Sequence, residues 1–403
     1  MTPESSLCPQ RSAALLARPW WQIVLAVALL AILVIEIAGM AGTKVIVPLA
    51  GAWKVTLPAG DRGDTIEGRF VRWDSNEYLR VARDGYRVGG EEAAFFPLYS
   101  LAMRHFSAVS GLSLMWSGLL ISVAAFLVAC LLLYQWAALD YSPQTARWAV
   151  LWLCFFPMSF FLVATYAESL FLAAAVASLY LARRGHFLAS GVAIALAGAT
   201  RPPAFLLTIP YVIEFVLQRD FFRRRTLSFV LGALVAPVGT LLYLAAQAAQ
   251  APASGLLAPF TSQQAGNWQR WTTWPWVTLW DGLRSAVLGT GVNPGWFTRA
   301  IAWQNLVFSA GAVALAACSL LLMRGSASAY FVASMIFFLS THGQPSEPLM
   351  SMPRWVAGIP PLYLCLALIS LKLPARVRWL ALAASAVLLV ASAAAFTSGR
   401  WIA

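Results

Sequence analysis

The sequence is poor in charge. Asp, Glu, Lys and Arg together make up 11% of its 403 residues, whereas apolar residues make up 60%. A soluble fold of this length needs many more charges on its surface, so this composition points to a bilayer as the solvent. Apolar runs of the roughly 20 residues needed to cross a bilayer recur along the chain. The first, Trp20 to Gly42, follows Arg11 and Arg18 and lacks a small-residue cleavage site, which predicts a retained membrane helix rather than a signal peptide.

Motifs that bind metals or nucleotides are also missing. The five cysteines are scattered without a CxxC pair, His342 has no partner at metal-ligand spacing, and no glycine-rich phosphate loop occurs. We therefore expect no metal ion and no other cofactor. The net charge of +12 does not indicate nucleic acid, because the basic residues cluster between apolar runs, where they orient a chain in its membrane.

The apolar runs predict about 11 transmembrane helices in one all-α polytopic membrane domain over residues 1–403. They lie near residues 20–41, 113–136, 147–164, 167–182, 187–200, 203–218, 227–249, 301–323, 326–341, 355–371 and 379–398. The positive-inside rule puts the N-terminus in the cytoplasm, and the linkers "ARRGH", "QRDFFRRR", "MRG" and "KLPARVR" then all fall on the cytoplasmic side. Two long segments, 42–112 and 250–300, are left on the extracytoplasmic side.

Polar residues in or beside the apolar runs gather at their outer ends under this topology. Ionisable groups near the hydrocarbon are costly and usually face a cavity or a polar partner. The pattern predicts one polar site at the outer membrane face, made from Glu168, Arg201, Arg270, His342, Glu347 and Arg354.

The stretch "FVRWDSNEYLRVARDGY", residues 70–86, places six charged residues in the first outer loop. Asp74 followed by Glu77 predicts the start of a helix, and Gly85 predicts the end of a short helix over about Ser75–Asp84. Two roles are open for Asp74. It is either the N-cap of a surface helix with solvated charges, or a base at the rim of a membrane cavity that takes a proton from an attacking hydroxyl.

Several motifs follow one another over roughly residues 69–363. They are "RWDSNEYLRVARDGY", "EEAAFFPLYSLA", "FFPMSFFLVATYAESLF", "ATRPPA", "QRWTTWPW" and "SMPRWVAGIPPLY". In this order they resemble the PIG-V (GPI mannosyltransferase 2-like) family of membrane mannosyltransferases, and the chain is similar to its bacterial-type members. The resemblance implies a GT-C glycosyltransferase fold in the inner or plasma membrane, with interfacial helices in the first outer loop and an extracytoplasmic active site. It also implies a polyprenyl-phosphate sugar as the donor.

The resemblance further implies the site residues. Asp74, in "RWD", matches the family's catalytic base, and Arg72 beside it would favour the ionised carboxylate. The expected substrate-binding residues are Arg72, Trp73, Tyr166, Glu168, Arg201, Arg270 and Arg354. A guanidinium matches phosphate geometry, so Arg201 or Arg354, and after them Arg270, are candidates for the carrier phosphate. One departure is Trp355, where the family's arginine is followed by tyrosine or phenylalanine.

Structural roles for these residues stay open beside the functional ones. Glu168 could form a hydrogen bond between helices, and Arg201 and Arg354 could snorkel or pair with Glu168 or Glu347. The tryptophans of segment 250–300 predict an interfacial belt, or alternatively the lining of an entrance for the carrier lipid. They are Trp268, Trp271, Trp274, Trp276, Trp280 and Trp296.

The expected reaction is an inverting transfer of a hexose, mannose by resemblance, from polyprenyl-phosphate-mannose to a lipid-linked or cell-envelope acceptor. The alternative from another class is a transporter or flippase for a lipid-linked sugar, because polar residues in membrane helices also mark transport pathways. A transporter would place them near the midplane and often has inverted repeats with broken helices. Here they gather at one face and no repeat stands out, which favours the enzyme.

Overall fold

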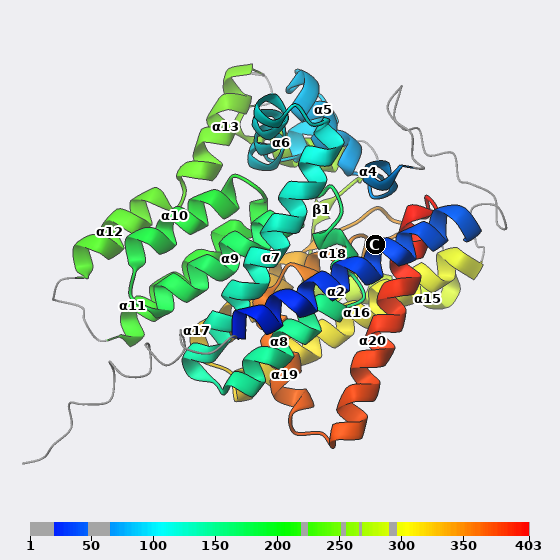
Figure 1. Cartoon of the computed structure of the whole chain (residues 1–403). Helices are drawn as coiled ribbons and strands as arrows, with labels where there is room; N and C mark the ends of the chain where they lie inside the picture. The colour runs from blue at the N-terminus through cyan, green and yellow to red at the C-terminus, as the bar shows by residue number, and fades with distance from the viewer. Residues whose placement is uncertain are drawn as a thin grey trace, which may run out of the picture.

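A computed structural model describes the chain over residues 20–46, 65–218, 225–250, 255–265, 268–289 and 296–402. Figure 1 shows an almost wholly helical molecule. The two strands of the described ranges, β1 (Trp271–Thr272) and β2 (Thr341–His342), pair antiparallel with Trp271 opposite His342. The predicted all-α polytopic class is confirmed. Parts of the predicted outer segments 42–112 and 250–300, and of the linker "QRDFFRRR", lie outside the described residues.

Each of the eleven predicted segments contains a helix. The main helices are α2 (Trp20–Ala41), α7 (Leu114–Asp140), α8 (Pro143–Phe155), α9 (Glu168–Arg183), α10 (Phe187–Gly198), α11 (Thr208–Leu217), α12 (Thr226–Val235), α13 (Val238–Gln250), α16 (Trp296–Leu322), α17 (Gly325–Leu339), α19 (Pro360–Ser370) and α20 (Ala375–Thr397). Within the described ranges, five helical segments are long and apolar enough to cross a membrane by themselves: Trp20–Lys44, Leu114–Asp140, Thr226–Gln250, Arg299–Leu322 and Ala375–Thr397.

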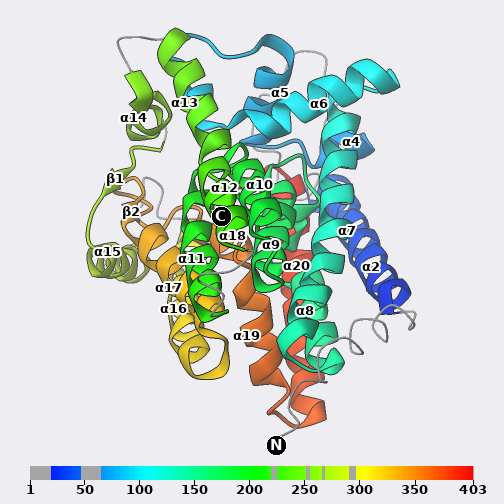
Figure 2. The ribbon, with the colours of Figure 1, turned by 90° about the vertical axis from the view of Figure 1, so that its left-hand side faces the viewer.

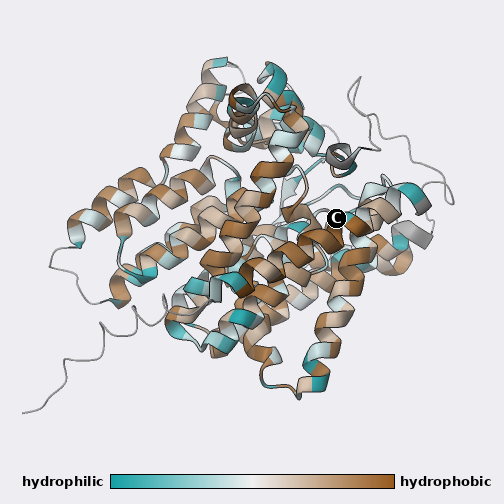
Figure 3. Cartoon of the chain, in the orientation of Figure 1, coloured by the Kyte–Doolittle hydropathy of each residue, from teal (hydrophilic) through white to brown (hydrophobic). Residues whose placement is uncertain are grey.

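Shorter elements connect the main helices. They are η1 (Gly42–Ile46), α4 (Ile66–Arg69), α5 (Ser75–Asp84), η2 (Glu91–Ala94), α6 (Pro97–Ser110), η3 (Ser159–Leu162), η4 (Pro202–Leu207), η5 (Gly255–Leu257), α14 (Ala258–Gln264), α15 (Pro275–Leu288) and α18 (Met352–Ala357). Figure 2 shows α5, α6 and α14 at the top of the bundle and the connection between α19 and α20 at the bottom. In Figure 3 the hydrophilic residues lie mostly toward the ends of the helices.

The predicted helix over 147–164 is wrong in its second half. Helix α8 ends at Phe155, and Phe156 is extended (φ −67°, ψ 142°) because Pro157 follows it and disfavours helical backbone at the preceding residue. The chain continues through η3 in a compact, irregular path up to the start of α9. The side chains of Phe160, Phe161 and Leu162 are fully buried there. Irregular backbone at membrane depth is tolerated where protein surrounds it, and this segment leads to Glu168, the first residue of α9 and part of the site described next.

Prolines also divide other predicted segments. The run over 203–218 is split into η4, which begins at Pro202, and α11. The run over 227–249 is split near Pro237 into α12 and α13, and the run over 355–371 near Pro360 into α18 and α19. Proline has no backbone N–H to donate and clashes with the preceding turn. Arg201 directly precedes η4 and Arg354 lies within α18, and both side chains face the same space.

Candidate active site

A cavity of about 510 Å³ opens at the end of the bundle that carries α5 and α6. Five of the eight predicted site residues line it, although up to 280 positions separate them in the sequence. Asp74 precedes α5, Glu168 begins α9, Arg201 precedes η4, Arg270 precedes β1 and Arg354 lies in α18. The complete lining is Asp74, Tyr78, Ala94, Phe95, Phe96, Glu168, Thr200, Arg201, Pro202, Gln263, Trp268, Arg270, Arg354 and Trp355.

Helix α5 has the predicted bounds, Ser75–Asp84, and Gly85 ends it with a positive φ of 79°. The predicted capping by the Asp74 side chain is wrong. A capping residue has an extended backbone, and its side chain accepts a hydrogen bond from a backbone N–H in the first turn of the helix. Asp74 instead has helical angles (φ −59°, ψ −22°), and its carboxylate makes no cap hydrogen bond. Asp74 Oδ2 instead accepts a hydrogen bond from Nη1 of Arg354 at 2.6 Å. The interpretation of solvated surface charges therefore fails at Asp74.

Arg354 connects the two carboxylates of the cavity. Besides its bond to Asp74, its Nε lies 3.5 Å from Oε1 of Glu168. The Arg354 side chain is only 7% exposed, so both ion pairs form in surroundings with little water to screen them. Three aromatic rings lie within 6 Å of its guanidinium carbon: Phe161 at 5.7 Å, Tyr166 at 5.6 Å and Trp401 at 5.8 Å.

Glu168 forms a second salt bridge, in which Oε1 accepts from Nη1 of Arg201 at 2.7 Å. Glu168 is the first residue of α9, so its side chain lies at the N-terminal end of that helix, which carries partial positive charge. The pairing of Arg201 and Arg354 with Glu168, one of the structural roles expected from the sequence, is therefore present. Oε2 of Glu168 is buried and has no hydrogen-bond partner among the described residues.

Arg270 is the third arginine of the cavity. It is 6% exposed, its guanidinium carbon lies 4.3 Å from the centre of the Trp355 ring, and Nη2 donates to Oγ of Ser351 at 3.3 Å. The pKa of Arg270 is lowered to about 9, mainly by burial and also by the positive charge of Arg354, while Asp74 acts in the opposite direction. The arginine is thus held without a carboxylate partner among the described residues.

The backbone is strained at three points around this cavity. Trp73 (φ 54°), Gln269 (φ 44°) and Ser351 (φ 69°) are the non-glycine residues with positive φ in the described part of the chain. Trp73 directly precedes Asp74, Gln269 directly precedes Arg270, and Ser351 directly precedes the helix of Arg354. Such conformations cost about 1–3 kcal/mol each and cluster at functional sites. The strain therefore marks the same side chains that the sequence motifs single out.

Arg72 and Tyr166 lie beneath the cavity and are absent from its lining. Arg72 donates from Nη1 to the carbonyl oxygens of Gly68 (2.7 Å) and Val71 (2.8 Å) and from Nη2 to that of Thr397 (3.2 Å). Tyr166 is fully buried, and its hydroxyl donates to the Arg72 carbonyl at 2.9 Å. These bonds fix the loop before Asp74 to α4 and to the end of α20. The salt bridge of Asp74 is with Arg354 rather than with Arg72, the partner expected from the sequence.

Trp73 also lies outside the cavity lining. Its ring packs edge-on against Trp401 at a centroid distance of 5.3 Å. Trp401 itself lies far from every sequence motif, yet it contacts Trp73 and lies beside Arg354. No sequence pattern indicates it, because Trp401 lies far from Trp73 along the chain.

A longer, mostly apolar groove of about 800 Å³ continues from the cavity. The two hollows share Arg201, Pro202, Gln263, Arg270 and Trp355. Beyond these, the groove is lined by Pro203, Phe260, Gln264, Trp271, Thr272, Phe337, Phe338 and Thr341. A polar chamber at one end and an apolar channel at the other suit an amphipathic ligand.

The tryptophans of segment 250–300 divide between the two roles expected for them. Trp268 lines the cavity and Trp271 lines the groove. Trp274, Trp276 and Trp280 are 60–66% exposed on and beside α15, as expected of an interfacial belt. The side chain of Trp296 lies outside the described residues.

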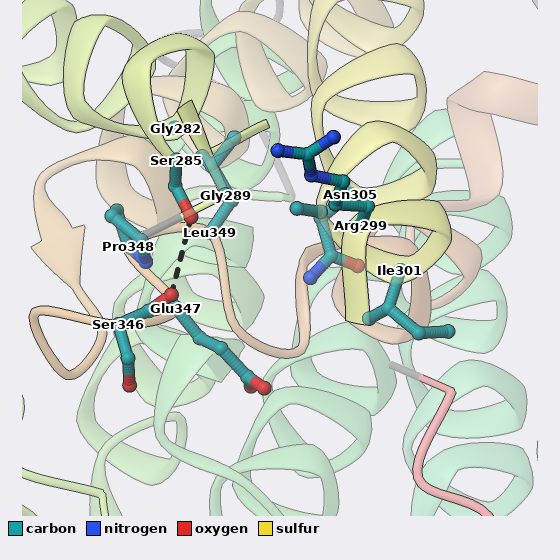
Figure 4. Close-up of a pocket in the computed structure, with 11 residues that line it drawn as sticks. Gly282, Ser285, Gly289, Arg299, Ile301, Asn305, Ser346, Glu347, Pro348 and Leu349 are labelled. Atoms are coloured by element: carbon teal, nitrogen blue, oxygen red, sulfur yellow. Dashed lines mark hydrogen bonds between the residues drawn. The ribbon is translucent and has the colours of Figure 1, made fainter. Parts of the chain in front are cut away.

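Two polar residues predicted for the site lie elsewhere. Glu347 faces a separate hollow of about 420 Å³ between α15, α16 and the loop before α18, and Figure 4 shows its side chain with Arg299 and Asn305 around that space. Burial raises the pKa of Glu347. His342 stacks on Trp271 at 4.0 Å, and its Nε2 lies 3.3 Å from Oδ2 of Asp281. The prediction of one polar site is therefore wrong for these two residues.

Other lining residues were missed by the sequence analysis. Tyr78, Phe95 and Phe96 lie in or near the first motifs and line the cavity. Aromatic residues are commonly part of the core, so their type alone does not indicate a site. Gln263 precedes the "QRW" motif, and its backbone carbonyl accepts from the Arg270 N–H at 2.9 Å. Its neighbours Thr261, Ser262 and Gln264 are polar as well, so no local pattern distinguishes Gln263 from them.

Comparison with known proteins identifies the fold and the family pattern. The sequence model of the family described as Mannosyltransferase (PIG-V) matches residues 59–342. The structure is similar to crystal structures of ArnT from Cupriavidus metallidurans. The form bound to undecaprenyl phosphate has a TM-score of 0.54 at 16% identity, over 91% of this chain and 62% of that chain. The apo form has a TM-score of 0.53 at 17% identity, over 90% and 62%.

These similarities confirm the expected GT-C fold. The chain spans 62% of the length of the ArnT structures. At this level of identity the likeness concerns the fold. A search of curated proteins finds no significant match.

Proposed function

This chain belongs to the PIG-V family of mannosyltransferases, and from this membership we propose that it transfers a hexose, with mannose as the family's sugar, from a polyprenyl-phosphate carrier to a lipid-linked or cell-envelope acceptor. The reaction would take place on the extracytoplasmic face. The observation that carries the proposal is the joining of a polar chamber around Asp74 to an apolar groove.

Asp74 is the proposed base. Its Oδ2 is held by Arg354, while no hydrogen bond to Oδ1 occurs within the described residues, and the side chain is 14% exposed to the cavity. A carboxylate held in this way can accept a proton from an acceptor hydroxyl.

The proposed reaction is a single displacement at the anomeric carbon. The acceptor oxygen forms the new bond to that carbon, its proton passes to Asp74, and the bond to the phosphate oxygen breaks with its electron pair leaving on the phosphate. One base and no covalent sugar–enzyme intermediate imply inversion. The unpaired Oε2 of Glu168 would accept a hydrogen bond from a sugar hydroxyl.

The proposed donor fits the shape of the site. A sugar attached to a polyprenyl phosphate is polar at one end and apolar along its length, as are the joined hollows. The fold relative ArnT was crystallised with undecaprenyl phosphate, which supports a carrier lipid of this class. The rival function, transport of a lipid-linked sugar, fits less well, because the charged residues gather in a single cavity beside α5, which lies at the top of the bundle in Figure 2.

Transfer by substituted enzymes tests the proposal. Sugar transfer from radiolabelled polyprenyl-phosphate-mannose to a membrane extract is measured for the wild type, Asp74→Asn and Asp74→Ala. We expect Asp74→Asn to lower transfer about 100-fold or more, because a general base contributes this much to the rate. The matched control is Asp84→Asn, an exposed aspartate at the other end of α5, which should leave transfer unchanged. Full activity in a folded Asp74→Asn variant would contradict the assignment of the base.

A further inference from the structure

The charges that line the cavity do not balance. Three arginines, Arg201, Arg270 and Arg354, face two carboxylates, Asp74 and Glu168. Arg201 pairs with Glu168, and Arg354 pairs with Asp74 and approaches Glu168. Arg270 has no carboxylate within salt-bridge distance among the described residues. A buried charge without a counterion is costly, so the cavity has room for one additional anion beside Arg270.

Arg270 also has a hydrogen-bond donor without an acceptor among the described residues. Nη1 is buried and has no partner among the described residues, whereas Nη2 has one long bond, 3.3 Å, to the Ser351 hydroxyl. Buried polar atoms in folded proteins are nearly always satisfied, so an exception calls for an explanation. A guanidinium edge presents parallel N–H groups that match two oxygens of a phosphate. The lowered pKa of Arg270 agrees with a buried guanidinium that has no counterion among the described residues.

The position of Arg270 fits the middle of an amphipathic donor. The residue lines both the polar cavity and the apolar groove. A sugar beside Asp74 and an isoprenoid chain along Phe260 and Phe337 would place the connecting phosphate where the two hollows meet. Arg201 lies at this junction too, but its guanidinium is already neutralised by Glu168 at 2.7 Å.

The guanidinium is held rigidly at this junction. It stacks on Trp355, the residue that departs from the family's tyrosine or phenylalanine, at 4.3 Å. The Arg270 backbone N–H donates to Gln263, and the strained Gln269 fixes the direction in which the side chain leaves the chain. A preorganised donor needs no rearrangement when charge develops on its ligand.

We infer that Arg270 is the residue that binds the phosphate of the polyprenyl carrier and stabilises it as the leaving group. The inference rests on the proposed function for its substrate class. During transfer the carrier changes from a phosphodiester with one negative charge to a phosphomonoester with a second charge developing. The hydrogen bonds from Arg270 therefore strengthen toward the transition state, while Arg201 and Arg354 order the two carboxylates.

Direct lipid binding tests the inference without turnover. The full chain is purified in detergent, and affinities for undecaprenyl phosphate and for uncharged undecaprenol are compared in the wild type, Arg270→Gln and Arg270→Lys. We expect the wild type to prefer the phosphate, Arg270→Gln to lose at least 10-fold of that preference, and Arg270→Lys, which keeps the charge but not the fork, to fall between them. The control is Arg299→Gln, an exposed arginine beside the separate hollow of Figure 4, which should behave as the wild type.

Three results would overturn the inference. One is an undiminished preference for undecaprenyl phosphate in Arg270→Gln. Another is a loss of preference in Arg201→Gln while Arg270→Gln retains it. The third is stabilisation of the wild type by inorganic phosphate alone to the same extent as by the lipid, which would indicate an anion site with no relation to a carrier.

Kinetics separates this inference from the proposed function. If the chain transfers mannose, Arg270→Gln should lower kcat about 100-fold or more, with a smaller change in KM, as when one preorganised donor to a developing anion is removed. A rise in KM of about 100-fold with kcat unchanged would contradict a role for Arg270 with the leaving group. If the wild type binds undecaprenyl phosphate through Arg270 but transfers no sugar, the proposed function fails while the phosphate site stands.

Discussion

Within the cavity, charge pairing assigns different tasks to chemically similar side chains. Arg354 forms a salt bridge with Asp74 and Arg201 forms one with Glu168, whereas Arg270 has no carboxylate partner among the described residues. Removing one partner of a buried ion pair typically costs about 3–5 kcal/mol, because the other charge remains buried and unpaired. Loss of activity in variants of Arg354 or Arg201 would thus reflect disorder of the carboxylates as well as any contact with substrate.

Gln269 offers a test of whether backbone strain positions Arg270. Its side chain is exposed, and its φ of 44° suits glycine far better than a β-branched residue. We expect Gln269→Gly to retain transfer and Gln269→Val to reduce it several-fold, because valine in the left-handed region costs roughly 1–2 kcal/mol and would rotate the backbone before Arg270. Transfer rates and melting temperatures of both variants provide the measurement.

The two variants control for one another, since both remove the same amide side chain. Equal activity in folded Gln269→Gly and Gln269→Val would show that the left-handed conformation is not needed. Equal loss in both would assign the effect to the missing side chain.

At the scale of the elements, close helix crossings hold the wall of the site. Gly239 in α13 lies against α10, where an added Cβ would clash with the carbonyl oxygen of Ala195. Helix α13 carries Tyr243, whose hydroxyl donates to the Ala93 carbonyl in η2 at 2.6 Å. Small residues permit this approach, as is common between membrane helices.

We expect Gly239→Ala to lower the melting temperature, because overpacking a close contact costs about 1–3 kcal/mol. The matched control is Gly311→Ala in α16, where an added Cβ meets nothing within 4 Å. That variant should be neutral or stabilising, since alanine favours helix over glycine. Thermal unfolding of the two purified variants measures the difference in melting temperature. Equal melting temperatures would show that α13 can move away from α10 without loss of stability.

The elements also show how far local sequence patterns reach. The acidic start and the glycine stop predicted the bounds of α5 correctly. The apolar run over 147–164 was predicted as one helix, because hydropathy does not separate a membrane helix from a buried irregular segment. Pro157 was the local sign of the break that ends α8 at Phe155.

Helix α5, beside the charged cavity, and the basic turn between α19 and α20 lie at opposite ends of the molecule. Asp74 lies beside α5 at the top of the bundle in Figure 2, and the turn between α19 and α20, near Arg376, lies at the bottom. The positive-inside rule then predicts that the cavity faces away from the cytoplasm.

Labelling of single cysteines tests this orientation. An impermeant thiol reagent applied to intact cells should label Asp84→Cys and should label Arg376→Cys only after the membrane is permeabilised. Both positions are exposed. The unsubstituted chain measures the background from native cysteines such as the exposed Cys318. The reverse pattern would place the proposed active site in the cytoplasm and contradict a donor that is used outside.

The sequence by itself determined the membrane character, the helical class, the family pattern and most of the charged residues that line the cavity. These follow from composition, from apolar runs and from motifs, which are properties of short stretches of chain. It also indicated Asp74 as the central acid, although it assigned the carboxylate a capping contact that it does not make.

Only the tertiary structure decided which charges meet. The Asp74–Arg354 contact spans 280 positions, and the Arg72–Thr397 bond spans 325. No local pattern encodes such pairs, because they depend on how prolines divide the helices and how the two ends of the chain pack together. The pairing of two arginines and the isolation of Arg270 follow from that packing, since a buried charge is balanced by the nearest opposite charge in space, whatever its distance in sequence.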